Sequence, residues 1–92
     1  MATLIIPTPL RKFTEGESIY TASASNVKEL LVALYTSHDG IKKHLFDDEG
    51  ELRSFIRVYL GDEDINELEG VNTKLEDRDE VSIIPAIAGG SK

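Results

Sequence analysis

The sequence predicts a single α+β domain in which one amphipathic helix packs on one face of a mixed β-sheet of four to five strands. Three observations support this prediction. The chain opens with two strand-like runs, a helical period follows them, and further strand-like runs close the chain. Its 92 residues, of which 40% are hydrophobic, suffice for one core but not for two.

The first two strands are expected at residues 2–7 and 18–22, on either side of a turn at 14–17. The segment ATLIIP is rich in apolar and β-branched residues and ends at Pro7. Within the turn, Gly16 is free to adopt a positive φ. A strand, a short connection and a second strand together favour a β-hairpin.

The helix is expected within residues 23–40, where apolar residues recur at the helical spacing. We expect Ser25 to cap its first turn and Gly40 to stop it. Residues 41–46 are expected to add one or two further helical turns. The apolar face consists of Val27, Leu30, Leu31, Leu34 and Tyr35.

The third strand is expected at residues 55–60, after an acidic turn at 47–51. The side chains of FIRVYL divide into two faces at the period of a strand. One face holds Ile56, Val58 and Leu60, and the other holds Phe55, Arg57 and Tyr59.

The last third of the chain is expected to end in a strand at residues 80–84. The connector before it is polar except at Ile65 and Leu68, which are expected to anchor a short strand or helical turn. Leu75 is expected to be buried beside a charged turn. Because the first and last strands have the most continuous apolar runs, we expect them to lie side by side.

Charge and composition exclude several classes of function. The net charge is −7, from 17 acidic and 10 basic residues, so nucleic acid is not an expected partner. The acidic surface suits a basic protein partner, or solubility alone. The chain has no cysteine, no signal-like start and no apolar run near the roughly 20 residues that span a bilayer. We therefore expect a cytoplasmic protein that makes no membrane contact.

The sequence contains no convincing catalytic or metal-binding constellation. Its two imidazoles, His38 and His44, lie near a helix end with no cysteine nucleophile to pair with. The segment DEDIN, residues 62–66, resembles the start of a calcium loop, but Glu67 stands where that loop requires glycine. We therefore expect no catalytic residue and no bound metal.

The C-terminal segment PAIAGGSK is composed mainly of small residues. Beyond Ile84 the sequence no longer resembles packed structure, so we place the domain at residues 1–86 and a flexible tail at 87–92. An extended backbone ending in Gly89 and Gly90 can enter a narrow channel in another protein, because glycine permits close approach. The reactive group is then the carboxylate of Gly90, and the protein is a carrier or substrate rather than an enzyme.

Four stretches of the sequence carry a resemblance to a known family. They are IIPTPLR near the start, VKELLVAL in the helix, FIRVYLGDEDI in the middle and LEDRDEVSIIPAIAGG at the end. Through them the chain resembles, almost from end to end, the MoaD/ThiS family of ubiquitin-like sulfur carriers. IPTPLR, the long helix-to-strand segment and YLGDEDI resemble the CysO-type branch, which serves cysteine biosynthesis. The resemblance implies a ubiquitin-like β-grasp fold with a Gly-Gly tail.

The resemblance also implies a chemistry for the tail residues Ala88, Gly89 and Gly90. An adenylyltransferase similar to ubiquitin-activating enzymes would adenylate the Gly90 carboxylate with ATP, and sulfur would replace AMP to give a thiocarboxylate. A pyridoxal-phosphate cysteine synthase would accept that sulfur, and a JAMM-type zinc metalloprotease would release the product. ATP, pyridoxal phosphate and zinc would belong to these partners, and none is expected to be bound by this chain.

An apolar docking patch is the second feature that the resemblance implies. If Leu4 and Ile6 face the helix, alternation places Ile5 on the opposite face of the sheet. That outer face and the root of the tail supply the expected docking residues, although half-buried sheet positions would share the same pattern. The expected docking residues are Ile5, Arg57, Tyr59, Ile84, Pro85 and Ile87.

The sequence departs from the family pattern after Gly90, where most carriers of this type end. An internal Gly90 carbonyl cannot be adenylated, so we expect Ser91-Lys92 to be removed by cleavage between Gly90 and Ser91. A remnant of cloning is the competing explanation for these two residues.

Three alternatives to a carrier for cysteine synthesis remain open at this point. The chain could be the small subunit of a molybdopterin synthase, with the large subunit as its partner, or another sulfur donor of the MoaD/ThiS type. It could instead be a ubiquitin-like modifier that is joined through Gly90 to lysines of other proteins. The third alternative is an acidic interaction domain with an inert tail. In each case we expect a monomer when no partner is bound.

Overall fold

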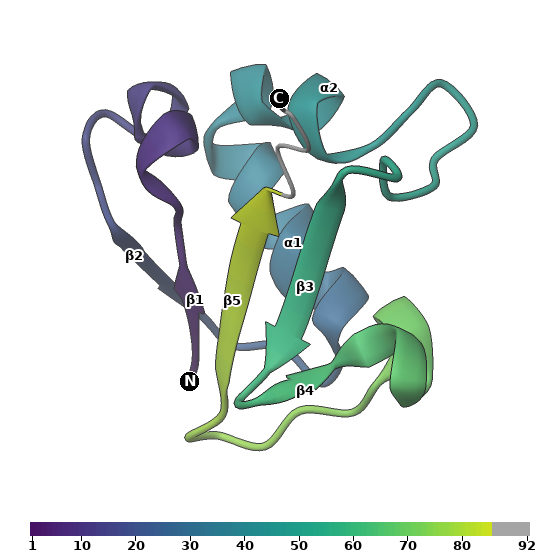
Figure 1. The fold of residues 1–92 in the computed structure, drawn as a ribbon. Coiled ribbons are helices and arrows are strands. Elements are labelled where there is room, and N and C mark those ends of the chain that lie inside the picture. The colour runs from purple at the N-terminus through teal and green to yellow at the C-terminus, as the bar shows by residue number, and fades with distance from the viewer. Residues whose placement is uncertain (86–92) are drawn as a thin grey trace.

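A computed structural model describes residues 1–85 as a five-stranded mixed sheet with helices packed against one face (Figure 1). The strand order is β2-β1-β5-β3-β4; β1 and β5 are parallel, and the other neighbours are antiparallel. The predicted fold class and the pairing of the first and last strands are therefore confirmed. The strands are β1 (Ala2–Ile5), β2 (Ile19–Ala22), β3 (Ile56–Leu60), β4 (Glu63–Asp64) and β5 (Glu80–Pro85).

Helix α1 (Val27–Ser37) begins one residue later than expected, and its cap is Asn26 rather than Ser25. The Asn26 Oδ1 accepts a hydrogen bond of 2.8 Å from the Glu29 backbone N–H. Ser25 serves the same turn differently: its backbone N–H and its hydroxyl each donate to Glu29 Oε1 at 2.8 Å. These two bonds, the backbone one first, lower the pKa of Glu29. The backbone N–H groups of Ser25 and Glu29 therefore both have acceptors at the start of the helix.

The end of α1 also differs from the expectation, because Gly40 does not stop it. The helix ends at Ser37, and His38 caps it by donating its backbone N–H to the Leu34 carbonyl at 2.9 Å. Gly40 lies in the 3₁₀ turn η2 (Asp39–Ile41), which leads into α2 (Lys42–Leu45). The expected additional helical turns after residue 40 are therefore confirmed.

Two expected strand ends and one expected anchor need correction. Strand β1 stops before Pro7 because the chain turns into the 3₁₀ helix η1 (Thr8–Phe13), in which the second residue is another proline. Strand β5 continues to Pro85, which is paired with Ile56. Leu68 does not anchor the connector, since its side chain is 37% exposed.

The connector is instead held by Ile65, which is almost fully buried at the start of η3 (Ile65–Glu67). A further turn, η4 (Gly70–Asn72), leads to Leu75, which is buried as expected. In the hairpin between β1 and β2, Gly16 adopts a φ of 85°, which confirms the positive φ expected there.

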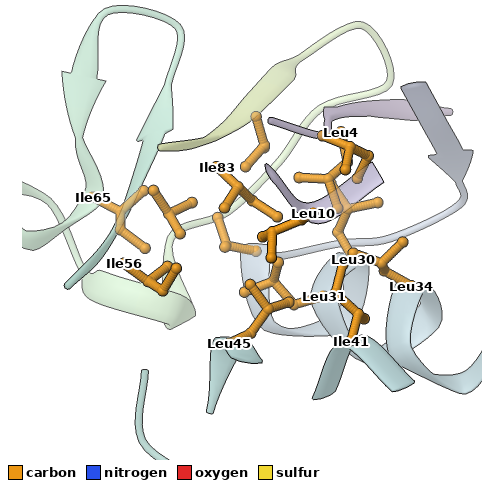
Figure 2. Close-up of a cluster of buried hydrophobic side chains, with 14 of the residues drawn as sticks. Leu4, Leu10, Leu30, Leu31, Leu34, Ile41, Leu45, Ile56, Ile65 and Ile83 are labelled. Carbon is orange, nitrogen blue, oxygen red and sulfur yellow. The ribbon is translucent and has the colours of Figure 1, made fainter. Parts of the chain in front are cut away.

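The core lies between α1 and the inner face of the sheet (Figure 2). Leu30, Leu31 and Leu34 point from α1 toward Leu4 of β1 and Ile83 of β5. Each such buried aliphatic side chain stabilises the fold by about 1.5–3 kcal/mol relative to exposure. The inner rows of β1, β3 and β5 are consequently committed to packing, and only their outer rows are available for other contacts.

Candidate functional site

The outer face of the sheet is defined by the strand register. One row of paired residues crosses all five strands, from Ile19 through Ile5, Ser82 and Tyr59 to Asp64. In the adjacent pairing toward the end of β5, Ile84 lies opposite Arg57. The register therefore brings Ile5, Arg57, Tyr59 and Ile84 onto one face, as the alternation of the sequence predicted.

Exposed apolar side chains mark this face. Ile84 is 45% exposed, whereas Ile5 and Tyr59 are half-buried by their neighbours. Ile19 is 52% exposed in the same row, and Phe55 is 48% exposed just before β3. The expected docking set omitted both residues, although alternation had already placed Phe55 on the face of Arg57 and Tyr59. The period of SIYTA could have placed Ile19 on the face opposite to that of Tyr20.

Arg57 is oriented by a neighbour on the same face. Its Nη1 lies 3.3 Å from Asp64 Oδ2 on β4. The other oxygen of Asp64 accepts a 2.9 Å hydrogen bond from the Asn66 backbone N–H and so caps η3. Because the Arg57 side chain remains half exposed, its contribution to stability is small, about 0–1 kcal/mol, and its charge is available to a partner.

The root of the tail lies where β5 ends, beside the start of β3. Pro85 is half-buried and faces Ile56 across the strand pair, and it has no N–H to donate. Beyond it the chain continues into residues 86–92, which lie outside the described residues. The expected functional residues Ile87, Ala88, Gly89, Gly90 and Ser91 belong to this segment, so the structure leaves them as sequence predictions.

The two histidines lie away from the outer face, and each contacts a different aromatic residue. His38 meets Tyr20 edge-on, with ring centroids 6.2 Å apart, and His44 stacks on Phe13 at 4.2 Å. Within residues 1–85, no group of three or more His, Cys, Asp or Glu side chains is placed to hold a metal ion. The same part of the chain contains no helix of the length and apolarity that a bilayer crossing requires.

A mixed sheet wrapped around one main helix, with its last strand parallel to its first, is the ubiquitin-like β-grasp fold. The sequence profile of the ThiS family matches residues 4–90, and the chain belongs to this family. The match extends through Gly90 and so includes both glycines of the tail.

Individual relatives show which members of the family this chain resembles. Sulfur carrier protein CysO of Mycobacterium tuberculosis is 37% identical over 96% of this chain and 97% of its own. A chain in the crystal structure of the Amycolatopsis orientalis BexX/CysO complex superposes with a TM-score of 0.89 at 39% identity, covering 98% of this chain and 100% of that chain. Small archaeal modifier protein 3 of Haloferax volcanii is 33% identical over 87% of this chain and 88% of its own. The resemblance to CysO-type carriers is thus confirmed.

Proposed function

We propose that this protein is a sulfur carrier whose active group is a thiocarboxylate on Gly90, and that the sulfur it carries serves cysteine biosynthesis. The observation that carries the proposal is the likeness to CysO sulfur carriers, which extends over 96% of the chain. The family match through Gly90 supports the choice of the reacting carboxylate. The chain itself acts as a co-substrate of its partners and not as a catalyst.

The proposed chemistry proceeds in two balanced steps. A Gly90 carboxylate oxygen attacks the α-phosphorus of ATP in the partner, which forms an acyl adenylate and releases pyrophosphate. Hydrosulfide then attacks the acyl carbon, the bond from that carbon to the AMP oxygen breaks and AMP leaves, so that sulfur stands where one carboxylate oxygen stood. The adenylyltransferase supplies ATP, a pyridoxal-phosphate cysteine synthase accepts the sulfur, and a zinc protease of the JAMM type releases the product.

Within this proposal the outer face of the sheet docks the partners. The exposed side chains of Ile19, Phe55 and Ile84 offer apolar contact, and Arg57 offers a charge held in place by Asp64. A partner that covers this face lies next to Pro85 and can receive the chain that follows it.

The proposal requires a free carboxylate on Gly90, and Ser91-Lys92 must therefore be removed first. ATP–pyrophosphate exchange with the host adenylyltransferase tests this requirement. A chain that ends at Gly90 should support exchange, whereas the full 92-residue chain and a chain that ends at Gly89 should not. Equal exchange by all three chains would contradict the assignment of Gly90.

A second candidate function is conjugation to proteins. It is favoured by the 33% identity to small archaeal modifier protein 3 over 87% of this chain. Both functions begin with adenylation of Gly90, so they diverge only at the acceptor. Isopeptide bonds from Gly90 to lysines of host proteins would support the modifier, and sulfur transfer to an activated serine derivative would support the carrier. Transfer to a molybdopterin precursor would redirect the proposal to a molybdopterin synthase subunit.

A further inference from the structure

One edge of the sheet has no neighbouring strand. Within residues 1–85, β2 is the outermost strand on its side and pairs only with β1 (Figure 1). The strand at the other edge, β4, consists of Glu63 and Asp64, and charges at an edge discourage pairing with a further strand. Strand β2 has the sequence IYTA, with neither a charged residue nor a proline, so its edge lacks this protection.

The register determines which backbone groups of β2 point away from β1. The Ile6 backbone N–H donates to the Ser18 carbonyl oxygen at 2.8 Å, one pair beyond the end of the β1–β2 register. Bonded and non-bonded pairs alternate in an antiparallel ladder, so the N–H and C=O groups of Ile19 and Thr21 point outward. Among the described residues, no backbone group outside the sheet bonds to Ile19 or Thr21.

The side chains leave this edge accessible and hold it in place. Ile19 and Thr21 are both exposed. Tyr20, between them, points to the helix side, where its hydroxyl donates to the Ala33 carbonyl oxygen at 3.0 Å and lies 3.1 Å from Ser37 Oγ. The edge of β2 is therefore fixed against α1 before anything binds to it, which lowers the entropy cost of binding.

Outward N–H and C=O groups at every second residue fit another extended backbone, and β2 of a second copy presents the same groups. If Ile19 of each copy faces Thr21 of the other about a two-fold axis, both residues join hydrogen-bonded pairs of two bonds each. A register shifted toward the start of β2 would need the Glu17 N–H, which already donates to the Thr14 carbonyl oxygen at 3.0 Å. A shift the other way would need residues beyond the end of β2. The strand is thus complementary to itself in one register.

The side chains suit the same register. Glu17 faces Ser23 of the second copy and not its Glu17, so no like charges stand directly opposite each other. On the outer face the two Ile19 side chains are diagonal neighbours across the axis, and each covers apolar surface of the other. The net charge of −7 on each copy opposes association, and salt should therefore strengthen it by screening that charge.

We propose that two copies of this chain pair through the free edges of β2, in an antiparallel two-fold arrangement that joins their sheets into one. The proposal does not depend on the function proposed above. It replaces the monomer expected from the sequence with a weak dimer, because two short strands make a small interface. A two-fold axis perpendicular to the joined sheet keeps both outer faces on the same side, where a symmetric partner can bind both copies at once.

Sedimentation equilibrium of the full 92-residue chain tests the association. We expect a Kd on the order of 0.1–1 mM that becomes tighter as salt rises. In NMR spectra over the same concentrations, the amide signals of Ile19 and Thr21 should shift together, because their N–H groups gain acceptors. A chain that stays monomeric at about 1 mM, or shifts that centre on Tyr59 and Ile84 instead, would overturn the inference.

Three variants separate the effect of the edge from that of net charge. Ile19→Lys places a charge on the edge, whereas Leu68→Lys makes the same change of net charge in the connector. The added cation by itself favours association of an acidic chain, so a loss in Ile19→Lys must come from the edge. We expect Ile19→Lys to weaken the Kd by about tenfold or more and Leu68→Lys to change it by less than about twofold.

Thr21→Pro removes an outward N–H that the ladder with β1 does not use, so it should also weaken the dimer while the circular dichroism spectrum is retained. Equally tight association of Ile19→Lys and Leu68→Lys, or of Thr21→Pro and the wild type, would overturn the inference. The concentration dependence of the wild-type amide signals provides a reading that requires no variant to fold.

Discussion

Asn26, and not the expected Ser25, caps the start of α1. Ser25 and Asn26 both belong to the residue types that cap helices, so composition alone could not choose between them. The glutamate three residues after Asn26 is the distinguishing signal, because Glu is favoured at the third position of a helix. In the structure the Asn26 side chain accepts from the Glu29 backbone N–H. The interaction that Ser25 makes, with the Glu29 carboxylate, depends on a side-chain conformation that the sequence does not reveal.

Replacing Asn26 with alanine should therefore lower the free energy of unfolding by about 1 kcal/mol, because the Glu29 N–H loses its acceptor. Urea unfolding followed by circular dichroism measures this loss as a lower midpoint with an unchanged slope. Asn26→Ser, which retains an acceptor, should stay close to wild type. A larger loss in Ser25→Ala than in Asn26→Ala would contradict the assignment of the cap.

The pKa of His44 should lie below the ordinary histidine value of about 6.5, because burial and then the charges of Lys43, Lys12 and Arg53 lower it. The folded protein thus favours neutral His44 more than the unfolded chain does. This contribution to stability is present above the unfolded pKa and is lost as pH falls through the lowered folded pKa. An NMR titration of the imidazole measures it.

The same titration of Lys12→Ala should move the pKa of His44 upward, since one of the cations that lowers it is removed. Lys74→Ala is the matched control, because Lys74 is absent from the charges that act on His44. A midpoint for His44 at or above 6.5 in the wild type would contradict the lowering of its pKa by burial and by the neighbouring cations.

Two consecutive residues of strand β5 have different roles, one in the core and one on the outer face. Ile83 is 2% exposed and packs against the helix, while Ile84 is 45% exposed on the outer face. Ile83→Ala should lower the free energy of unfolding by about 2–4 kcal/mol, because it opens a cavity in the core. Ile84→Ala should change stability by less than about 1 kcal/mol and should weaken binding of the adenylating enzyme.

Denaturant unfolding of both variants, together with the Kd of the enzyme for each, distinguishes these roles. Comparable losses of stability at the two positions would contradict the division of β5 into an inner and an outer row. Unchanged enzyme binding in Ile84→Ala would remove Ile84 from the docking face while leaving the fold as described.

The periodic elements could be predicted from the sequence because their apolar spacing records which face is buried. The structure has both the predicted apolar stripe of α1 and the predicted alternation of buried and exposed residues in β3. The errors occur where long-range packing decides which apolar residue is buried. In the connector Ile65 is almost fully buried, whereas Leu68 is 37% exposed. Likewise, the ion pair between Arg57 and Asp64 joins residues of two strands, and no local sequence pattern predicts it.

For the molecule as a whole, the parallel pairing of β1 with β5 determines which segments lie at the end of the sheet where β5 stops. It places η1, the start of β3 and the last described residue of β5 at one end of the sheet. The outer face adjoins this end, whereas the buried inner row of the sheet holds the domain together. The sequence predicted four residues of the outer face that the register confirms, and its prediction for the glycine pair lies outside the described residues. The contact of Phe13 with His44 joins two separate segments and became visible only in the fold.

The intact mass of the protein purified from its native host under non-reducing conditions tests the proposed carrier most directly. We predict a species that ends at Gly90 with one carboxylate oxygen replaced by sulfur, and its loss when the adenylyltransferase gene is deleted. Fragmentation should place the sulfur on Gly90. Recovery of only the full 92-residue chain from cells that are actively making cysteine, with no thiocarboxylate, would contradict the proposal.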